Sequence, residues 1–93
     1  MGQVLYIEDN PVNVVLMEAM LAQVPHIRLR SAPLPEVGLE LARLDPPDLI
    51  LLDVMMPGGS VLDVLAAIRA HDAAVPVLVL TAAVEIEYVT HCL

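Results

Sequence analysis

The chain has 93 residues, a length that suits one small domain. Hydrophobic residues make up 58% of the chain and charged residues 17%, a composition too apolar for a disordered polar segment. Acidic residues outnumber arginines by 12 to 4, lysine is absent, and the net charge of −8 repels phosphate backbones, which argues against nucleic acid as a direct partner.

The first predicted element is a strand at residues 4–7, which form a short, continuous apolar run. A run of this kind suits a strand that is buried on both faces. The run stops at Glu8 and Asp9, and Asn10 then suits the cap of a helix over residues 11–23. The apolar stripe of this helix is predicted to face the core.

A second strand and a second helix are predicted next. Apolar and basic residues alternate over residues 27–30, as they do in a strand at the margin of a sheet. Residues 37–44 return to a helical period that contains Gly38, and the prolines within residues 45–47 end this helix. The alternation of strand and helix therefore continues.

The remaining predicted elements repeat this order. Residues 48–53 suit another strand buried on both faces, and this strand ends on the carboxylate of Asp53. A helix over residues 61–68 follows, and residues 75–80 form a fourth buried run that ends at Thr81. Alternating strands and helices with apolar central runs predict an α/β fold, with an open parallel sheet and helices on both faces.

The functional crevice of such a sheet lies at the carboxyl ends of its strands. Glu8, Asp9, Asp53 and Thr81 occupy these positions in the sequence. Three converging carboxylates repel one another unless a cation lies among them, and hard oxygen ligands suit Mg²⁺. Such a site suits phosphoryl transfer, with Asp53 as the nucleophile and the Thr81 hydroxyl directed to a phosphoryl oxygen.

Three segments of the sequence resemble the receiver domain of two-component response regulators and hybrid histidine kinases, and the resemblance that rests on them covers nearly the whole chain. They read VLYIEDNPVN at residues 4–13, PDLILLDVMMPG at residues 47–58 and PVLVLTA at residues 76–82. The resemblance implies a flavodoxin-like, doubly wound parallel sheet with strand order 2-1-3-4-5. In this chain the sheet would be incomplete, with four strands of the usual five.

The resemblance also implies roles for individual residues. Glu8 and Asp9 would be the acidic metal pair, and Asp53 would be the phosphoacceptor that takes a phosphoryl group with Mg²⁺. The backbone carbonyl of Met55 would be a further metal ligand, and Thr81 would be the switch hydroxyl.

The implied partner is a histidine kinase or a histidine phosphotransfer domain. In the family, the exposed side of the first helix helps to receive the partner kinase. The domain would act as a switch in a phosphorelay and not as an enzyme.

The sequence departs from the family in its last part. The family carries a lysine at the end of a fifth strand, where it contacts the phosphoryl group, and this chain contains no lysine. The chain ends 12 residues after Thr81. Residues 1–93 are therefore predicted to form one receiver-like domain that is truncated at its C-terminus.

This truncation leaves the predicted strand at residues 75–80 as an exposed edge, which favours a homo-oligomer. Residues 84–90 alternate apolar and acidic side chains as a strand does, although their position in the family is helical. As a strand, they would cover the edge in their own chain or pair with a neighbouring copy by segment exchange.

Two other functions are left open. The first is a degenerate receiver that serves as a protein-interaction or dimerisation module without phosphorylation, which the absent lysine favours. The second is a metal-dependent phosphatase or other hydrolase, which needs a general acid or base beyond the three carboxylates.

The composition also predicts the compartment. No apolar run approaches the ~18 residues of a membrane span, so no membrane association is expected. The single cysteine, Cys92, cannot form a disulfide within the chain. A cytoplasmic location is therefore predicted.

Overall fold

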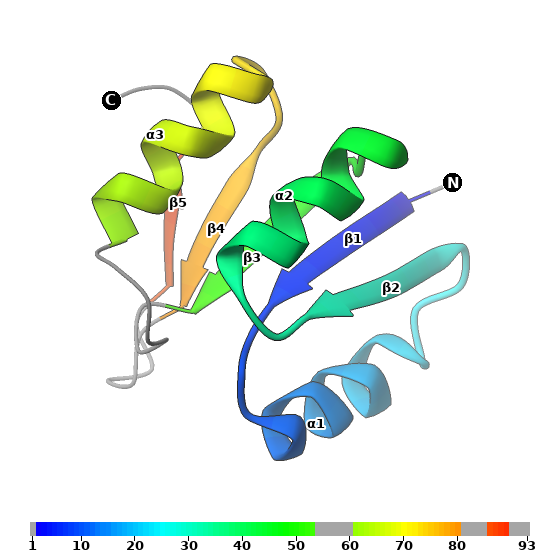
Figure 1. Cartoon of the computed structure of the whole chain (residues 1–93). Coiled ribbons are helices and arrows are strands. Elements are labelled where there is room, and N and C mark those ends of the chain that lie inside the picture. The colour runs from blue at the N-terminus through cyan, green and yellow to red at the C-terminus, as the bar shows by residue number, and fades with distance from the viewer. Residues whose placement is uncertain (1, 54–60, 81–85, 90–93) are drawn as a thin grey trace.

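A computed structural model describes residues 2–53, 61–80 and 86–89, which form a five-stranded sheet and three helices (Figure 1). The strands are β1 (Gly2–Ile7), β2 (Ile27–Ala32), β3 (Leu49–Asp53), β4 (Val77–Leu80) and β5 (Ile86–Val89). The helices are α1 (Pro11–Leu21), α2 (Pro35–Leu44) and α3 (Val61–His71). The strand order is β2-β1-β3-β4-β5, and the first four strands are parallel. The predicted α/β, flavodoxin-like arrangement is confirmed.

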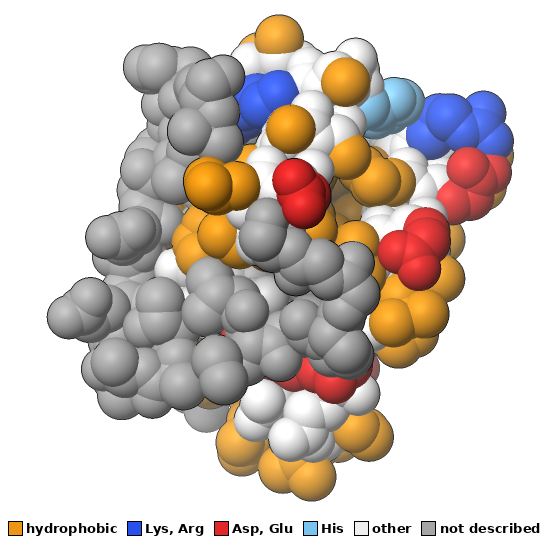
Figure 2. Space-filling view, turned by 60° about the vertical axis from the view of Figure 1, so that its left-hand side comes forward, with side chains coloured by type: hydrophobic (Ala, Val, Ile, Leu, Met, Phe, Trp, Pro, Cys, Tyr) orange, Lys and Arg blue, Asp and Glu red, His pale blue; other side chains and the backbone are white. Residues whose placement is uncertain are grey.

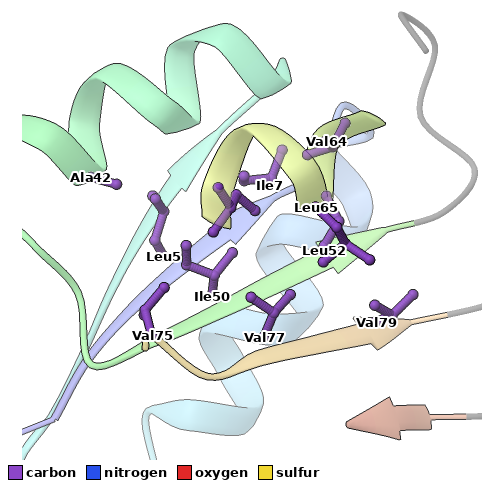
Figure 3. Packing of buried hydrophobic residues seen from close by; sticks show 11 residues of the cluster. Leu5, Ile7, Ala42, Ile50, Leu52, Val64, Leu65, Val75, Val77 and Val79 are labelled. Carbon is purple, nitrogen blue, oxygen red and sulfur yellow. The ribbon is translucent and has the colours of Figure 1, made fainter. Parts of the chain in front are cut away.

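Helices cover both faces of the sheet, with α2 and α3 on one face and α1 on the other (Figures 1 and 3). The larger hydrophobic cluster packs between the sheet and the pair α2 and α3. Its buried members are Leu5, Ile7, Ala42, Ile50, Leu52, Val64, Leu65, Ile68, Val75, Val77 and Val79. Because successive strand residues point to opposite faces, the continuous apolar runs of β1 and β3 supply both layers.

The α1 face is more thinly covered than the α2 and α3 face. Its buried cluster consists of Val4, Tyr6 and Leu51, against which Val14 and Met17 of α1 pack. The predicted apolar stripe thus faces the core at Val14 and Met17, but no residue of α1 is fully buried. Partial contact from one side of the helix leaves most of its apolar residues in solvent.

β5 lies beside β4 as an antiparallel strand of the same chain. Within residues 84–90, Ile86–Val89 therefore form a strand, as their alternating pattern predicts, and not the helix expected from the family. Only residues 81–85 separate the two strands, fewer than the crossover that a parallel strand requires, so the connection permits antiparallel pairing alone. The prediction of an exposed β4 edge is wrong, and the homo-oligomer expected through that edge loses its structural basis.

Gly38 of α2 lies directly against Ile7 of β1. A Cβ atom at this position would lie 2.7 Å from Cδ1 and 2.8 Å from Cγ1 of Ile7, whose side chain is fully buried. The glycine that interrupts the helical pattern in the sequence is thus explained by packing.

No helix in the described part of the chain is long and apolar enough to span a membrane.

Substitution of Gly38 by valine is expected to destabilise the fold by about 1–3 kcal/mol, because the new side chain must displace Ile7 from a close-packed core. The measurement is urea unfolding followed by circular dichroism. Because valine has a higher helix propensity than glycine, propensity alone would raise the stability of this variant and cannot account for a loss. An unchanged or raised stability of Gly38→Val would show that the contact with Ile7 is unimportant.

Candidate functional site

The carboxyl ends of β1 and β3 lie side by side and bring three carboxylates together. Ile7 pairs with Leu52 in the sheet, so Glu8 and Asp53 are the next residues along neighbouring strands. Both follow residues of the α2 and α3 layer and therefore point toward the α1 face. One carboxylate oxygen from each of Glu8, Asp9 and Asp53 lies within 4.8 Å of the others. The predicted convergence of these three residues is observed.

Glu8 is held in place on all sides. Its side chain is 3% exposed, and its carboxylate accepts three hydrogen bonds. The Tyr6 hydroxyl donates to Oε1 at 3.0 Å, the Asn13 side-chain amide donates to Oε1 at 3.3 Å, and the Asn10 backbone N–H donates to Oε2 at 3.1 Å. The Glu8 backbone N–H donates to the Ala32 carbonyl at 2.9 Å. These bonds offset the cost of burying a carboxylate.

The start of α1 forms the adjoining wall of the site. Asn10 caps the helix as predicted, because its Oδ1 accepts from the Val12 backbone N–H at 2.9 Å, and Pro11 occupies the first turn. Since Asn10 supplies the cap, the helix does not require Glu8 or Asp9 for this purpose. A purely capping role for the acidic pair is therefore not supported.

Tyr6 is a residue of the site that the sequence analysis missed. Its side chain is buried, and burial, the hydrogen bond to Glu8 and the charges of Glu8 and Asp53 all raise the pKa of Tyr6 above its ordinary value. The phenol therefore remains protonated, and a hydrogen-bond donor, throughout the physiological pH range. Tyr6 lies on β1, and Glu8 directly follows that strand two residues later; this spacing is the sequence signal that places the two side chains on the same face.

A hollow of about 310 Å³ opens beside the acidic side chains. Glu8 and Asp9 line one part of it, Val14 of α1 lines another, and Ser31 and Pro33 close it on the β2 side. Asp9 is exposed and Asp53 is half-buried. The carboxylates of Asp9 and Asp53 are thus accessible to an ion or a small ligand from solvent, whereas Glu8 is buried beneath them.

Two predicted site residues lie outside the described part of the chain. Met55 belongs to the segment 54–60 and Thr81 to the segment 81–85. Their predicted roles, the carbonyl ligand and the switch hydroxyl, stay predictions.

Comparison of the sequence with known proteins finds one matching family and several relatives. The family described as response regulator receiver domain matches residues 4–93. The transcriptional regulatory protein MalR of Bacillus subtilis is 36% identical over 90 residues, which are 96% of this chain and 38% of MalR. A probable cyclic di-GMP phosphodiesterase of Vibrio cholerae is 36% identical over 80 residues, 84% of this chain and 18% of that protein. The chain thus spans less than two fifths of either relative.

Solved structures show the same similarity. The receiver domain of the sensor histidine kinase PA1611 from Pseudomonas aeruginosa, with a magnesium ion coordinated in its active-site cleft, is 31% identical with a TM-score of 0.78. The match covers 87% of this chain and 67% of that one. The complex of histidine kinase ThkA with the response regulator TrrA gives 29% identity and a TM-score of 0.79, over 88% of this chain and 70% of that one.

Proposed function

The chain belongs to the response regulator receiver domain family, and we propose that it accepts a phosphoryl group on Asp53 from a histidine kinase or a histidine phosphotransfer domain, with Mg²⁺ bound at the acidic site. The observation that carries this proposal is the convergence of Asp53 with Glu8 and Asp9. Receiver domains are signalling switches, and we assign residues 1–93 to one such unit, working in the cytoplasm.

The donor set fits a magnesium ion. Three carboxylates supply hard oxygen ligands of the kind that Mg²⁺ prefers. Their oxygens lie within 4.8 Å of one another, a limit close to the ~4.2 Å that separates opposite ligands of an octahedral ion with bonds of about 2.1 Å. Glu8 has three of its acceptor positions occupied by hydrogen bonds, whereas Asp9 is exposed. Asp9 and Asp53 are therefore the proposed principal ligands, and Glu8, with its remaining acceptor position, and the backbone carbonyl of Met55 are the proposed further ligands.

The proposed reaction is a transfer between two side chains. A carboxylate oxygen of Asp53 attacks the phosphorus of a partner's phosphohistidine, so that an O–P bond forms and the N–P bond breaks. The imidazole nitrogen leaves with the electron pair of that bond and takes up a proton. Bound Mg²⁺ neutralises charge on the phosphoryl oxygens. Asp53 is suited to the attack because it terminates β3, where the rigid strand holds it beside the acidic pair.

The proposed switch follows from the position of Thr81 in the sequence. Thr81 directly follows β4, as Asp53 terminates β3, and Asp53 pairs with Leu80 in the sheet. A phosphoryl group on Asp53 would therefore find the Thr81 hydroxyl on the neighbouring strand end. The resulting hydrogen bond is the proposed signal to the rest of the molecule.

The proposed docking surface for the kinase is the exposed apolar side of α1. It consists of Val12, Val15, Leu16 and Met20, each more than half exposed. In Figure 2, hydrophobic side chains gather at the lower end of the molecule, where α1 lies. The similar solved structure, in which TrrA is bound to the histidine kinase ThkA, supports such a partner. Contiguous exposed apolar patches are also typical of interaction sites.

Leu16→Glu is expected to slow phosphoryl transfer from a kinase at least about tenfold, because a charge at the centre of an apolar contact costs more than about 1.4 kcal/mol. The measurement is the transfer rate from a purified histidine kinase that phosphorylates the unaltered chain. Leu44→Glu, at an exposed leucine on α2, is the matched control. A similar reduction in both variants would remove α1 from the docking surface.

The direct test of the function is to incubate the chain with Mg²⁺ and acetyl phosphate and to follow its intact mass. A single phosphoryl adduct that hydroxylamine removes, as it removes an acyl phosphate, supports the proposal. No adduct on a folded chain with bound Mg²⁺ would favour an interaction module that works without phosphorylation.

A further inference from the structure

The Tyr6 hydroxyl lies inside the hydrophobic layer that α1 covers. The buried hydrophobic residues of this layer are Val4, Tyr6 and Leu51, and the Tyr6 hydroxyl is the polar side-chain group among these three. A buried phenol requires a hydrogen-bond partner, and here that partner is Glu8 at 3.0 Å. This hydrogen bond connects a residue of the hydrophobic core directly to the acidic site.

The hydrogen bond from Tyr6 is one of three that orient the Glu8 carboxylate. An ionised carboxylate offers about four acceptor positions, and Tyr6, Asn13 and the Asn10 backbone occupy three of them. Of the two donors to Oε1, Asn13 is the more distant, at 3.3 Å, and lies on the first turn of a helix that has no buried residue. The Tyr6 ring is packed on β1 in the middle of the sheet, which makes it the firmer anchor.

We propose that Tyr6 is a positioning residue of the metal site, which holds Glu8 from within the core so that its carboxylate stays in reach of an ion shared with Asp9 and Asp53. This inference rests on the proposed function, because it concerns the Mg²⁺ that the site is proposed to bind. Residues that orient metal ligands through hydrogen bonds typically contribute 10- to 100-fold in metal affinity.

The test begins with Mg²⁺ titrations followed by calorimetry. Tyr6→Phe keeps the aromatic ring and its packing but removes the donor to Glu8, and it is expected to raise the Kd for Mg²⁺ about tenfold or more. Tyr88→Phe removes the other tyrosine of the chain, on β5, and is expected to leave the Kd unchanged. A Tyr6→Phe variant that binds Mg²⁺ within twofold of the unaltered chain overturns the inference.

A spectroscopic readout separates positioning from mere packing. The chain has two tyrosines and no tryptophan, so Tyr88→Phe leaves Tyr6 as the single phenol that absorbs in the near ultraviolet. If the Tyr6 hydroxyl bonds a carboxylate that turns to an ion, its absorption and emission will change with Mg²⁺ and saturate at the calorimetric Kd. A tyrosine signal that stays constant while Mg²⁺ binds overturns the inference, even where Tyr6→Phe proves too unstable to titrate.

The outcomes distinguish this inference from the proposed function. An unaltered chain that is folded and shows no Mg²⁺ binding contradicts both. If the chain binds Mg²⁺ and is phosphorylated normally while the Tyr6 absorption and emission stay constant, only the positioning role is contradicted. Weaker binding in Tyr6→Phe together with a saturating tyrosine signal supports both.

Discussion

Asp53→Asn is expected to abolish phosphorylation of the chain completely. The asparagine amide matches the carboxylate in shape, but it is not a nucleophile toward phosphorus at neutral pH, and no other described carboxylate has the same position at a strand end beside the acidic pair. Intact mass after incubation with Mg²⁺ and acetyl phosphate is the measurement. The unaltered chain is expected to gain one phosphoryl group and the variant none.

The matched control is Asp48→Asn, at the opposite end of the same strand. Asp48 is exposed, and its Oδ2 accepts a hydrogen bond from the Gln3 backbone N–H at 2.8 Å, a bond that asparagine can also accept. This variant is expected to take up one phosphoryl group as the unaltered chain does. A phosphoryl adduct on Asp53→Asn would identify a different acceptor and contradict the proposed function.

Asp9→Asn is expected to change thermal stability in opposite directions with and without Mg²⁺. Without the ion, removal of one of three clustered charges relieves about 1 kcal/mol or more of repulsion, since unit charges 4 Å apart interact by about that amount even in water. For a domain of this size, this corresponds to a rise in Tm of roughly 4–8 °C.

With Mg²⁺ the order of stability reverses. At a hundredfold excess over Kd, the bound ion adds about 2.7 kcal/mol to the stability of the unaltered chain, and the variant, which lacks a proposed direct ligand, loses most of this gain. Melting curves at several Mg²⁺ concentrations measure both effects. Glu18→Gln, which removes a charge from an exposed position on α1, is expected to show neither effect. A Tm for Asp9→Asn that rises with Mg²⁺ as the unaltered Tm does would exclude Asp9 as a ligand.

The candidate site was predictable from the sequence to the extent that it depends on strand ends. The runs that end at Glu8 and Asp53 are apolar and continuous, as central strands buried on both faces must be. Carboxyl ends of parallel neighbours meet at one edge of the sheet, so the two acidic positions were expected to be close. The cap at Asn10 was predictable for a similar reason, because capping depends on residues within one helical turn.

The role of Tyr6 was beyond such reasoning. The two-residue spacing places Tyr6 and Glu8 on one face of β1, but it does not tell which face α1 covers or whether the phenol is buried. Both facts depend on how α1 packs on the sheet, and α1 met the prediction made for it only in part. The sequence pattern of α1 suggested a core helix, whereas the sheet accepts only Val14 and Met17 from it.

By itself, the sequence determined the order of strands and helices, the parallel sheet and the acidic edge, because each of these follows from patterns within a few consecutive residues. Only the tertiary structure decided that β5 pairs with β4 of its own chain, that Gly38 makes room for Ile7, and that Tyr6 holds Glu8 within the fold. These features depend on the packing of one element against another, where small differences in contact free energy select among arrangements that local patterns allow equally.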